Sequence, residues 1–336
     1  MYNQELRNEV QKIMRELSSR NFMLATSPLI NLEKKINEWI NTNNPGGIIY
    51  GPPGTGKTTA ITYMMKALKS NYGDNLPVLR WVITDHTPSE KQFYSSLMAA
   101  VGLSEPKIHE TAKALKSRIV NTLAASAADS RYRMIILFID EASELTIRDF
   151  TWLMDLYNSL YQLDIILVPL MFGTYKLIAM REALREAGEE QIIGRFFTKD
   201  YLFRGLCEKN DLLQCMAALS QPLYIKSLNR NVVLPEYFFP DAYTDGHFFP
   251  NKLTDPYWDA FMCVQAEHGI SNADGIPMQY FISSFKDCLT TYGKGGPYEK
   301  YFPEQGDLEQ CIIDSGYLET GFNDRNVKNK KGRKAS

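Results

Sequence analysis

The chain has 336 residues, 44% of them hydrophobic, so it can bury a sizeable core and is expected to fold as two domains or more. Its formal net charge of −2 excludes a bulk polycation, so any binding of nucleic acid would need a local basic surface. No apolar run approaches a membrane span, the first residues carry no signal-peptide pattern, and the five cysteines lack C-x-x-C spacing, which together predict a cytoplasmic protein with reduced thiols.

Hydrophobic periodicity predicts strands that alternate with helices over the first two thirds of the chain. In chain order, the expected elements are helices over 1–24 and 29–42, a strand over 46–50, a helix over 59–70, a strand over 77–84, helices over 88–102 and 110–125, a strand over 133–141, a helix over 147–161, a strand over 163–172, a helix over 175–187, a strand over 196–203 and a helix over 208–220. This alternation predicts an α/β fold with a doubly wound, parallel, five-stranded sheet.

Two single residues refine this outline. Ser89 is expected to cap the helix over 88–102 at its N-terminus. Pro169 lies inside the fourth strand, and because proline has no N–H to donate, it predicts a bulge or an early strand end there.

A phosphate-binding pattern, G-x-x-x-x-G-K-[ST], follows the first strand. Its glycines allow the backbone angles that bring N–H groups round a phosphate, and the next helix would place the anion at its N-terminus. Lys57 can reach the outer phosphates, and the Thr58 hydroxyl can hold magnesium. The residues expected to hold the nucleotide here are Gly51, Pro52, Pro53, Gly54, Thr55, Gly56, Lys57, Thr58 and Thr59.

Two carboxylates close the apolar third strand. In nucleotide hydrolases a carboxylate at a strand end holds magnesium, and a second one beside it polarises the attacking water. Asp140 fits the first role and Glu141 the second, so Thr58 and Asp140 are the expected magnesium residues. Thr174, at the end of the fourth strand, either orients the water or only forms a Gly-Thr turn or helix cap.

An arginine precedes the expected fifth strand. Arg195 is positioned to reach the nucleotide of a neighbouring subunit and to stabilise charge in the transition state. Arg181 and Arg185 are alternatives, although a solvated helix face explains them better. The four histidines have no metal-ligand spacing.

These motifs, in this order, resemble those of the AAA+ ATPases, and over residues 20–220 they are similar to the target-selection ATPases of DNA transposons, the TnsC/TniB type. The likeness rests on five segments: Gly51–Thr58, Asp85–Ser89 with its following helix, Ile139–Ala142, Phe172–Thr174 and Arg195–Phe196. Ser143 departs from that family, where a glutamine is frequent. The resemblance implies an AAA+ P-loop fold with a helical lid and a C-terminal extension, and ATP and magnesium as cofactors.

The resemblance also implies a homo-oligomer, a ring or a helical filament, that assembles on double-stranded DNA, recruits a transposase and target-selection adaptors, and disassembles on ATP hydrolysis. No membrane partner is expected. In that family the DNA contacts follow the second strand. The candidates here are Lys91, Lys107, Lys113, Lys116 and Arg118, although a helical lysine is more often only solvated.

Charge and aromatic content change near residue 230, which predicts a domain boundary. Residues 231–324 hold 15 acidic and 4 basic residues and 18 of the 40 aromatic residues, whereas the end of the chain from Arg325 holds six basic residues and no acidic one. We therefore expect an N-terminal helical extension (1–24), an ATPase core (25–204), a helical lid (205–230), an acidic, aromatic-rich region that contacts a partner (231–324) and a basic, disordered tail (325–336).

Two other functions stay open at this point. One is an AAA+ ATPase of the helicase-loader type, or another that remodels proteins. The other is a nucleotide-switched scaffold with little turnover, against which Glu141 argues, because a site that only binds nucleotide has no need of that carboxylate.

Overall fold

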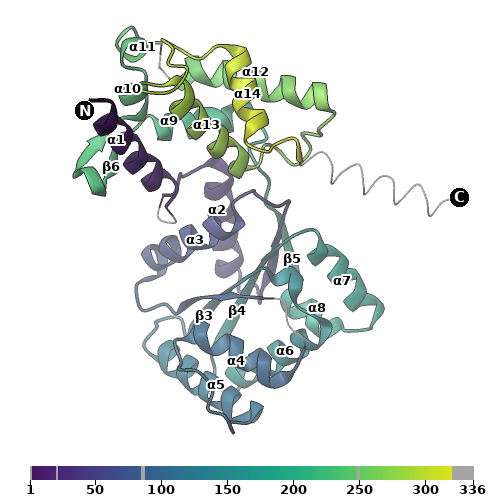
Figure 1. The fold of residues 1–336 in the computed structure, drawn as a ribbon. Helices are drawn as coiled ribbons and strands as arrows, with labels where there is room; N and C mark the ends of the chain where they lie inside the picture. Colours follow the sequence, from purple (N-terminus) through teal and green to yellow (C-terminus); the bar gives the residue numbers. More distant parts are fainter. Residues whose placement is uncertain (1, 20–21, 85–87, 248–249, 320–336) are drawn as a thin grey trace, which may run out of the picture. The chain divides into compact units, whose positions relative to one another are not determined.

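The computed structural model describes residues 2–19, 22–84, 88–247 and 250–319. Contacts along the chain divide it into two compact units (Figure 1). The first, named here the sheet unit, comprises Asn31–Pro53 and Lys57–Phe203. The second, the helical unit, comprises residues 1–30, Gly54–Gly56 and the chain from Arg204 onward.

The sheet unit is built on five parallel strands in the order β2-β3-β4-β1-β5. They are β1 (Gly47–Tyr50), β2 (Val78–Val82), β3 (Met134–Asp140), β4 (Ile166–Gly173) and β5 (Lys199–Leu202). All seven residues of β3 are buried, which explains its unbroken apolar run, because a central strand of a parallel sheet has helices over both faces. The predicted five-stranded, doubly wound α/β fold is confirmed.

Helices cover both faces of this sheet (Figure 1). They are α2 (Ser27–Asn41), α3 (Lys57–Tyr72), α4 (Glu90–Val101), α5 (Ala112–Ala128), α6 (Ile147–Tyr161), α7 (Lys176–Glu186) and α8 (Glu190–Phe196). Helix α3 packs along β2, β3 and β4, whereas α4, α5 and α6 pack against β2, β3 and β4 and against one another. The core between α4–α6 and the sheet includes Trp81, Phe93, Leu137 and Phe150.

Local capping fixes where several of these helices begin. Ser89 accepts a hydrogen bond from the N–H of Gln92, which confirms its predicted role as the cap of α4. Helix α6 begins and ends where predicted, and its start is fixed by a reciprocal capping box of Thr146 and Asp149.

Pro169 does not end or bulge its strand, so that prediction is wrong. It lies inside β4, paired with Leu137 of β3. The N–H of Ile166 points to β3, so the alternating backbone of the strand turns the nitrogen of Pro169 toward β1. Pairing of β4 with β1 begins only at the next residue, Leu170, opposite Gly47, so no ladder hydrogen bond is lost.

The segment expected as a strand over 196–203 is also different. Its first part belongs to helix α8, and only Lys199–Leu202 forms β5. Phe196 and Phe197 are buried and pack against Phe150 of α6. The N-terminal helix is shorter than expected as well, because α1 covers Tyr2–Leu17 rather than residues 1–24.

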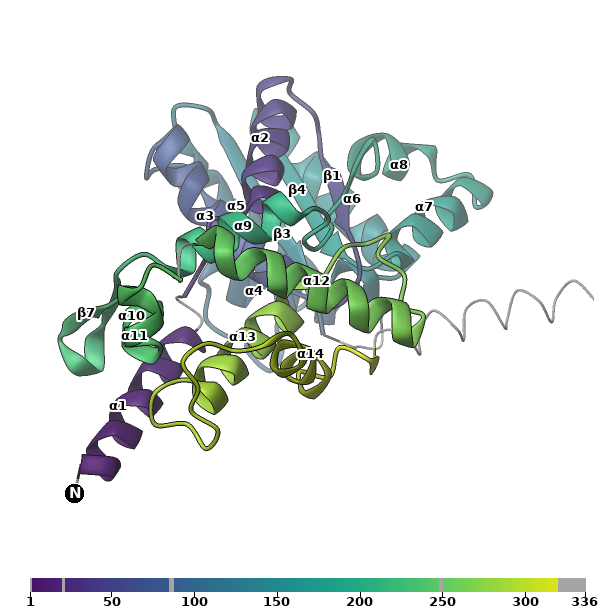
Figure 2. The same ribbon diagram turned by 90° about the horizontal axis from the view of Figure 1, so that it is seen from above.

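The helical unit holds α1, α9 (Lys209–Leu219) and a small antiparallel hairpin of β6 (Leu223–Ile225) with β7 (Arg230–Val232). Its other helices are α10 (Leu234–Phe238), α11 (Pro240–Thr244), α12 (Pro250–His268), α13 (Met278–Tyr292) and α14 (Gln305–Asp314). Helix α14 packs against both α12 and α13 (Figure 2). Rings of Tyr257, Phe261, Phe281 and Phe285 contact one another in its core.

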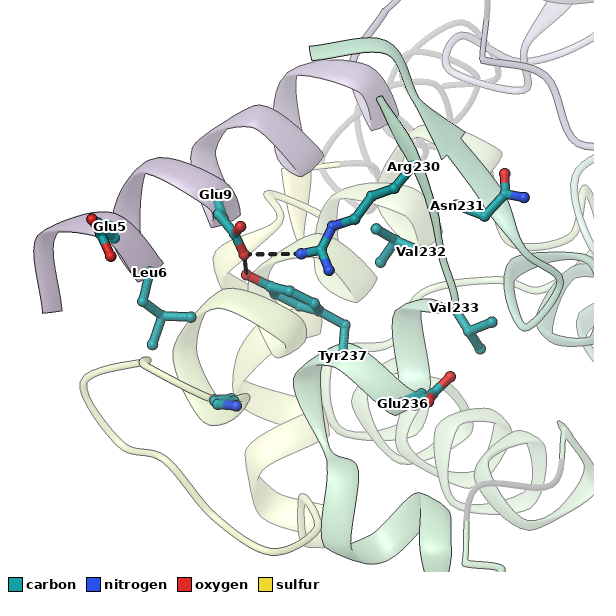
Figure 3. Close-up of a pocket in the computed structure, with 10 residues that line it drawn as sticks. Glu5, Leu6, Glu9, Arg230, Asn231, Val232, Val233, Glu236 and Tyr237 are labelled. Atoms are coloured by element: carbon teal, nitrogen blue, oxygen red, sulfur yellow. Dashed lines mark hydrogen bonds and ion pairs between the residues drawn. The ribbon is translucent and has the colours of Figure 1, made fainter. Parts of the chain in front are cut away.

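A polar pocket of about 480 Å³ lies in this unit between α1, β7 and α10 (Figure 3). One Glu9 oxygen accepts hydrogen bonds from Arg230, at 3.1 Å, and from the Tyr237 hydroxyl, at 2.9 Å. Glu5, Glu236 and Lys294 also line the pocket. The N-terminal helix α1 is therefore tied to β7 and α10 by an ion pair and a hydrogen bond within the helical unit.

The boundary expected at residue 230 falls inside the β6–β7 hairpin, so a division into lid and C-terminal region stays a proposal. The basic residues from Arg325 lie outside the described residues, as do residues 85–87 of the Asp85–Ser89 segment. Within the described part of the chain, no helix is both long and apolar enough to cross a membrane.

Candidate functional site

The carboxyl ends of three neighbouring strands bring the predicted motifs together. In the sheet β4 lies between β3 and β1, so the loop after β1, the Asp140-Glu141 pair after β3 and Thr174 after β4 share one edge. The N–H of Gly51 donates to the carbonyl of Gly173 at 3.2 Å, which ties the start of the loop to the end of β4. Segments far apart in the sequence thus form one candidate site at the carboxyl ends of these strands.

The loop after β1 needs its glycines for two different reasons. A Cβ atom at Gly51 would lie 2.1 Å from the carbonyl oxygen of Phe203, so only glycine fits beside the end of β5. Gly54 and Gly56 have φ angles of +77° and +93°, in the region that glycine adopts without strain. Helix α3 begins directly after this turn, at Lys57.

Lys57 reaches back to the start of the loop. Its ammonium donates to the carbonyl oxygens of Gly51, at 3.0 Å, and of Pro52, at 2.7 Å. Burial lowers the pKa of Lys57, and the nearby carboxylates of Glu141 and Asp140 oppose that shift. A half-buried cation therefore stands beside two acidic groups, at the place where the motif predicts phosphate.

Thr58 and Asp140 meet across the site. The Thr58 hydroxyl donates to Asp140 Oδ2 at 3.1 Å, and the backbone N–H of Glu141 donates to Oδ1 at 3.2 Å. Asp140 is only 3% exposed. Hydroxyl and carboxylate oxygens are the hard donors that magnesium prefers, so this predicted pair fits a magnesium ion.

Sequence reasoning missed Arg80, which lies at the same carboxylate. Its Nη2 donates to Asp140 Oδ2 at 2.6 Å. Arg80 pairs with Phe138 in the β2–β3 register, so Asp140 is the next residue of β3 on the same face of the sheet. A lone arginine inside the otherwise apolar strand Val78–Val82 was the available signal.

Glu141 has a left-handed backbone conformation, with a φ angle of 56°. Such angles are uncommon outside glycine and cluster at functional sites. The residue is exposed and directly follows β3, beside the Lys57 ammonium that its charge influences. It therefore lies on the side of the site where phosphate is expected.

Thr174 is held by Ser143, in the turn after Glu141. The N–H of Thr174 donates to the Ser143 hydroxyl oxygen at 2.7 Å, and the two hydroxyls lie 3.2 Å apart. A Cβ atom at Gly173 would lie 2.3 Å from the same oxygen. Ser143 thus joins the short 3₁₀ helix η1 (Ala142–Glu144) to the end of β4.

The three candidate arginines differ in their surroundings. Arg195 precedes β5 as predicted, in the last turn of α8; it is exposed and places its guanidinium 5.2 Å from the ring centre of Tyr157. Arg181 is partly buried and pairs with Asp200 of β5 at 2.9 Å. Arg185 is exposed and pairs with Glu182 of its own helix. Arg195 is the candidate whose guanidinium rests on an aromatic ring rather than in one of these pairs.

The five candidate DNA-binding residues fall into two groups. Lys116 pairs with Asp155 at 2.6 Å, and Arg118 pairs with Glu110 at 2.8 Å, so both already neutralise a carboxylate. Lys91, Lys107 and Lys113 are exposed on α4, on the segment before α5 and on α5. The Lys91 ammonium also donates to the carbonyl of Ile108 at 3.4 Å, and contact with DNA stays a prediction for all five residues.

Comparison with known proteins supports the fold. Residues 41–178 match the family model described as "AAA domain", and no curated protein matches the chain. Together with the strand order and the phosphate loop, this match identifies the sheet unit as an α/β AAA+ P-loop fold.

Several solved structures are similar at low identity. A chain of the Drosophila origin recognition complex, ORC, bound to AT-rich DNA and Cdc6 has 12% identity and a TM-score of 0.44, with 88% of this chain and 42% of that chain covered. PCH-2 of C. elegans has 13% identity and a TM-score of 0.40, with coverage of 92% and 68%. AMPPCP-bound DnaA from Aquifex aeolicus has 14% identity and a TM-score of 0.37, with coverage of 94% and 92%. The chain therefore spans less than half the length of the ORC chain that it matches.

Proposed function

We propose that this protein is a magnesium-dependent ATPase that assembles on double-stranded DNA and regulates transposition. The observation that carries the ATPase proposal is the meeting of Lys57, Thr58, Asp140 and Glu141 at the carboxyl ends of neighbouring strands. These are the side-chain types that phosphoryl transfer to water requires.

Each of these residues has one role in the proposed reaction. The loop N–H groups and Lys57 bind the phosphates, while Thr58 and Asp140 hold magnesium, which neutralises phosphate charge when bound. Glu141 accepts the proton of the attacking water, and Thr174 orients that water. The exposed carboxylate of Glu141 and the fixed backbone of Thr174 support these assignments.

We propose that the active form is a homo-oligomer, a ring or a helical filament, in which Arg195 of one subunit reaches the nucleotide of the next. An exposed guanidinium on the ring of Tyr157 is accessible to a second copy of the chain. Arginine supplied in trans stabilises the charge of the transferring phosphoryl group.

We propose that the oligomer assembles on duplex DNA. Lys91, Lys107 and Lys113 of each subunit would contact DNA phosphates, so the number of contacts grows with the number of assembled subunits. The transposition role, with a transposase and target-selection adaptors as partners in the cytoplasm, rests on the resemblance of the motifs to the TnsC/TniB type.

The helical unit is the proposed contact for such a partner. Tyr243, Tyr298 and Tyr301 are 40%, 68% and 47% exposed, and the Tyr301 hydroxyl bonds to Asp245 near the end of α11. Tyrosines that are partly buried and partly wet are frequent anchors at interfaces. The acidic balance of residues 231–324 disfavours DNA there.

Electron microscopy tests this proposal directly. The protein is mixed with duplex DNA and a non-hydrolysable ATP analogue, beside a sample without nucleotide and one with Lys57→Ala. Rings or filaments on DNA only in the first sample are expected. Monomers off DNA in all samples would overturn the DNA proposal and favour an ATPase that acts on proteins, while assemblies independent of nucleotide would favour a scaffold.

A further inference from the structure

We propose that Arg80 is a built-in counter-cation of the magnesium site, a positioning residue that neutralises Asp140 whenever no divalent cation does so. The inference rests on the proposed nucleotide-binding function. Its geometric basis is the 2.6 Å contact between Arg80 Nη2 and Asp140 Oδ2, the same oxygen to which the Thr58 hydroxyl donates at 3.1 Å.

The sheet register places this guanidinium at the site. Arg80 and Asp140 are 60 positions apart in the chain, but β2 and β3 run side by side and put them diagonally on one face. Helix α3 packs over β2 and β3, and it carries Thr58 to Asp140. Arg80 of β2 thus reaches the carboxylate of Asp140 on the face of the sheet that α3 covers. Helix α3 is the helix that follows the phosphate loop.

The charges explain why a cation is useful there. The Asp140 side chain is 4% exposed, and a buried carboxylate without a counter-charge is costly. Lys57 does not fill this role, because its ammonium donates to the loop carbonyls of Gly51 and Pro52. A nucleoside triphosphate would add further negative charge beside Asp140 and Glu141, and Arg80 offsets part of that repulsion.

The contact is also one that can be exchanged. Arg80 bonds to Asp140 through one nitrogen rather than through a two-pronged fork, and its side chain is 31% exposed. Its Nε is buried and has no hydrogen-bond partner among the described residues. Because Arg80 is held by a single hydrogen bond, it can release Asp140 when magnesium binds. Its remaining N–H groups can then donate to a phosphate oxygen.

The inference predicts how strongly nucleotide binding depends on magnesium. The dissociation constant of a fluorescent ATP analogue is measured for the full chain, without DNA, in magnesium and in EDTA. For the wild type we expect the two constants to differ by less than about tenfold, because Arg80 substitutes for part of the missing charge. In Arg80→Gln the ratio of the EDTA constant to the magnesium constant should rise by about tenfold or more.

Two further variants separate charge from structure. Arg80→Lys keeps the charge without the planar fork and should fall between the wild type and Arg80→Gln. Arg131→Gln removes an exposed positive charge just before β3, at the opposite edge of the sheet, and should leave the ratio unchanged. Circular dichroism melts confirm that each variant is folded.

Three outcomes would overturn the inference. The first is a ratio of the EDTA constant to the magnesium constant in Arg80→Gln that equals the wild-type ratio. A purely structural role of Arg80 would give this result, because it would weaken nucleotide binding equally in both buffers. The second is a wild type that binds only with magnesium, a result that needs no variant. The third, binding by the wild type in neither buffer, would overturn the proposed function and the inference with it.

Discussion

The hydroxyl oxygen of Ser143 accepts a hydrogen bond from the backbone N–H of Thr174 at 2.7 Å. This contact joins the turn that follows Asp140 and Glu141 to the end of the neighbouring strand β4. The fit is close, because any Cβ atom at Gly173 would lie 2.3 Å from the same oxygen. Ser143 thus couples the two strand ends that are proposed to act on the attacking water.

Ser143→Ala should slow ATP hydrolysis by several-fold and leave nucleotide affinity unchanged. The variant leaves the N–H of Thr174 without its acceptor, a loss of about 0.5–1.5 kcal/mol for a neutral hydrogen bond. Steady-state turnover and equilibrium nucleotide binding check the two parts. Ser126→Ala, which removes a hydroxyl bonded to Thr122 on the surface of α5, is the matched control. Equal loss of affinity and turnover would show that Ser143 only supports the fold.

Glu141→Gln should bind nucleotide normally, hydrolyse it at least about 100-fold more slowly and remain assembled on DNA. The amide is nearly isosteric but cannot take a proton from water. Glu144→Gln is the control from the same turn, since Glu144 is exposed and pairs with Lys176 at 3.0 Å. Single-turnover hydrolysis and electron microscopy provide the measurements. Normal turnover in Glu141→Gln would remove this residue from the proposed role.

The nucleotide motif and the individual strands of the sheet could be predicted because each is formed by a contiguous run of residues. The loop over Gly51–Thr59 carries its own conformational requirements, and the buried run of β3 leads directly to Asp140 and Glu141. What could not be predicted depends on contacts between elements. The Arg80–Asp140 pair follows from the register of β2 against β3, which no local pattern specifies.

The wrong start of the fifth strand, expected at residue 196 and found at Lys199, has the same origin. The run Phe196-Phe197 has strong strand propensity, but both rings fill the core beside Phe150, and this packing holds Phe196 in α8. The position of Arg195 on a helix surface therefore depends on tertiary packing that the sequence pattern did not contain.

Lys57→Met should abolish nucleotide binding and also change how stability depends on pH. Burial lowers the pKa of Lys57 below its ordinary value of 10.5, so the folded chain releases this proton at a lower pH than the unfolded chain. Between these two values the unfolded chain binds more protons, and the free energy of unfolding rises with pH. As the pH approaches 10.5, stability of the wild type relative to Lys57→Met should therefore increase.

Urea unfolding of both proteins at several alkaline pH values measures this difference, because the other titrating groups cancel between them. Lys69→Met is the control, since it removes an exposed ammonium from the same helix α3 and should keep nucleotide binding. A relative stability that falls as the pH rises would contradict the burial of Lys57 in the folded state.

Arg195→Ala should lower the turnover of the assembled protein by at least about 100-fold and leave nucleotide binding by single subunits intact. When the variant is mixed with the wild type, turnover should fall by more than the fraction of variant subunits, because each variant subunit also disables the site of its neighbour. Arg148→Ala removes an exposed arginine from α6 and serves as the control. Activity that falls only in proportion to dilution would show that Arg195 does not act in trans.

Gly51→Ala and Gly194→Ala should have opposite effects on stability. A Cβ atom at Gly51 would lie 2.1 Å from the carbonyl oxygen of Phe203, and neither backbone can yield, because the N–H of Phe203 donates to Tyr50 at 2.7 Å. We expect a loss of at least about 3 kcal/mol. At Gly194, inside α8, a Cβ atom meets nothing within 4 Å, so alanine should stabilise the fold by about 0.5–1 kcal/mol. Urea unfolding measures both, and a stable Gly51→Ala protein would mean that β1 and β5 are not held together as closely as this contact requires.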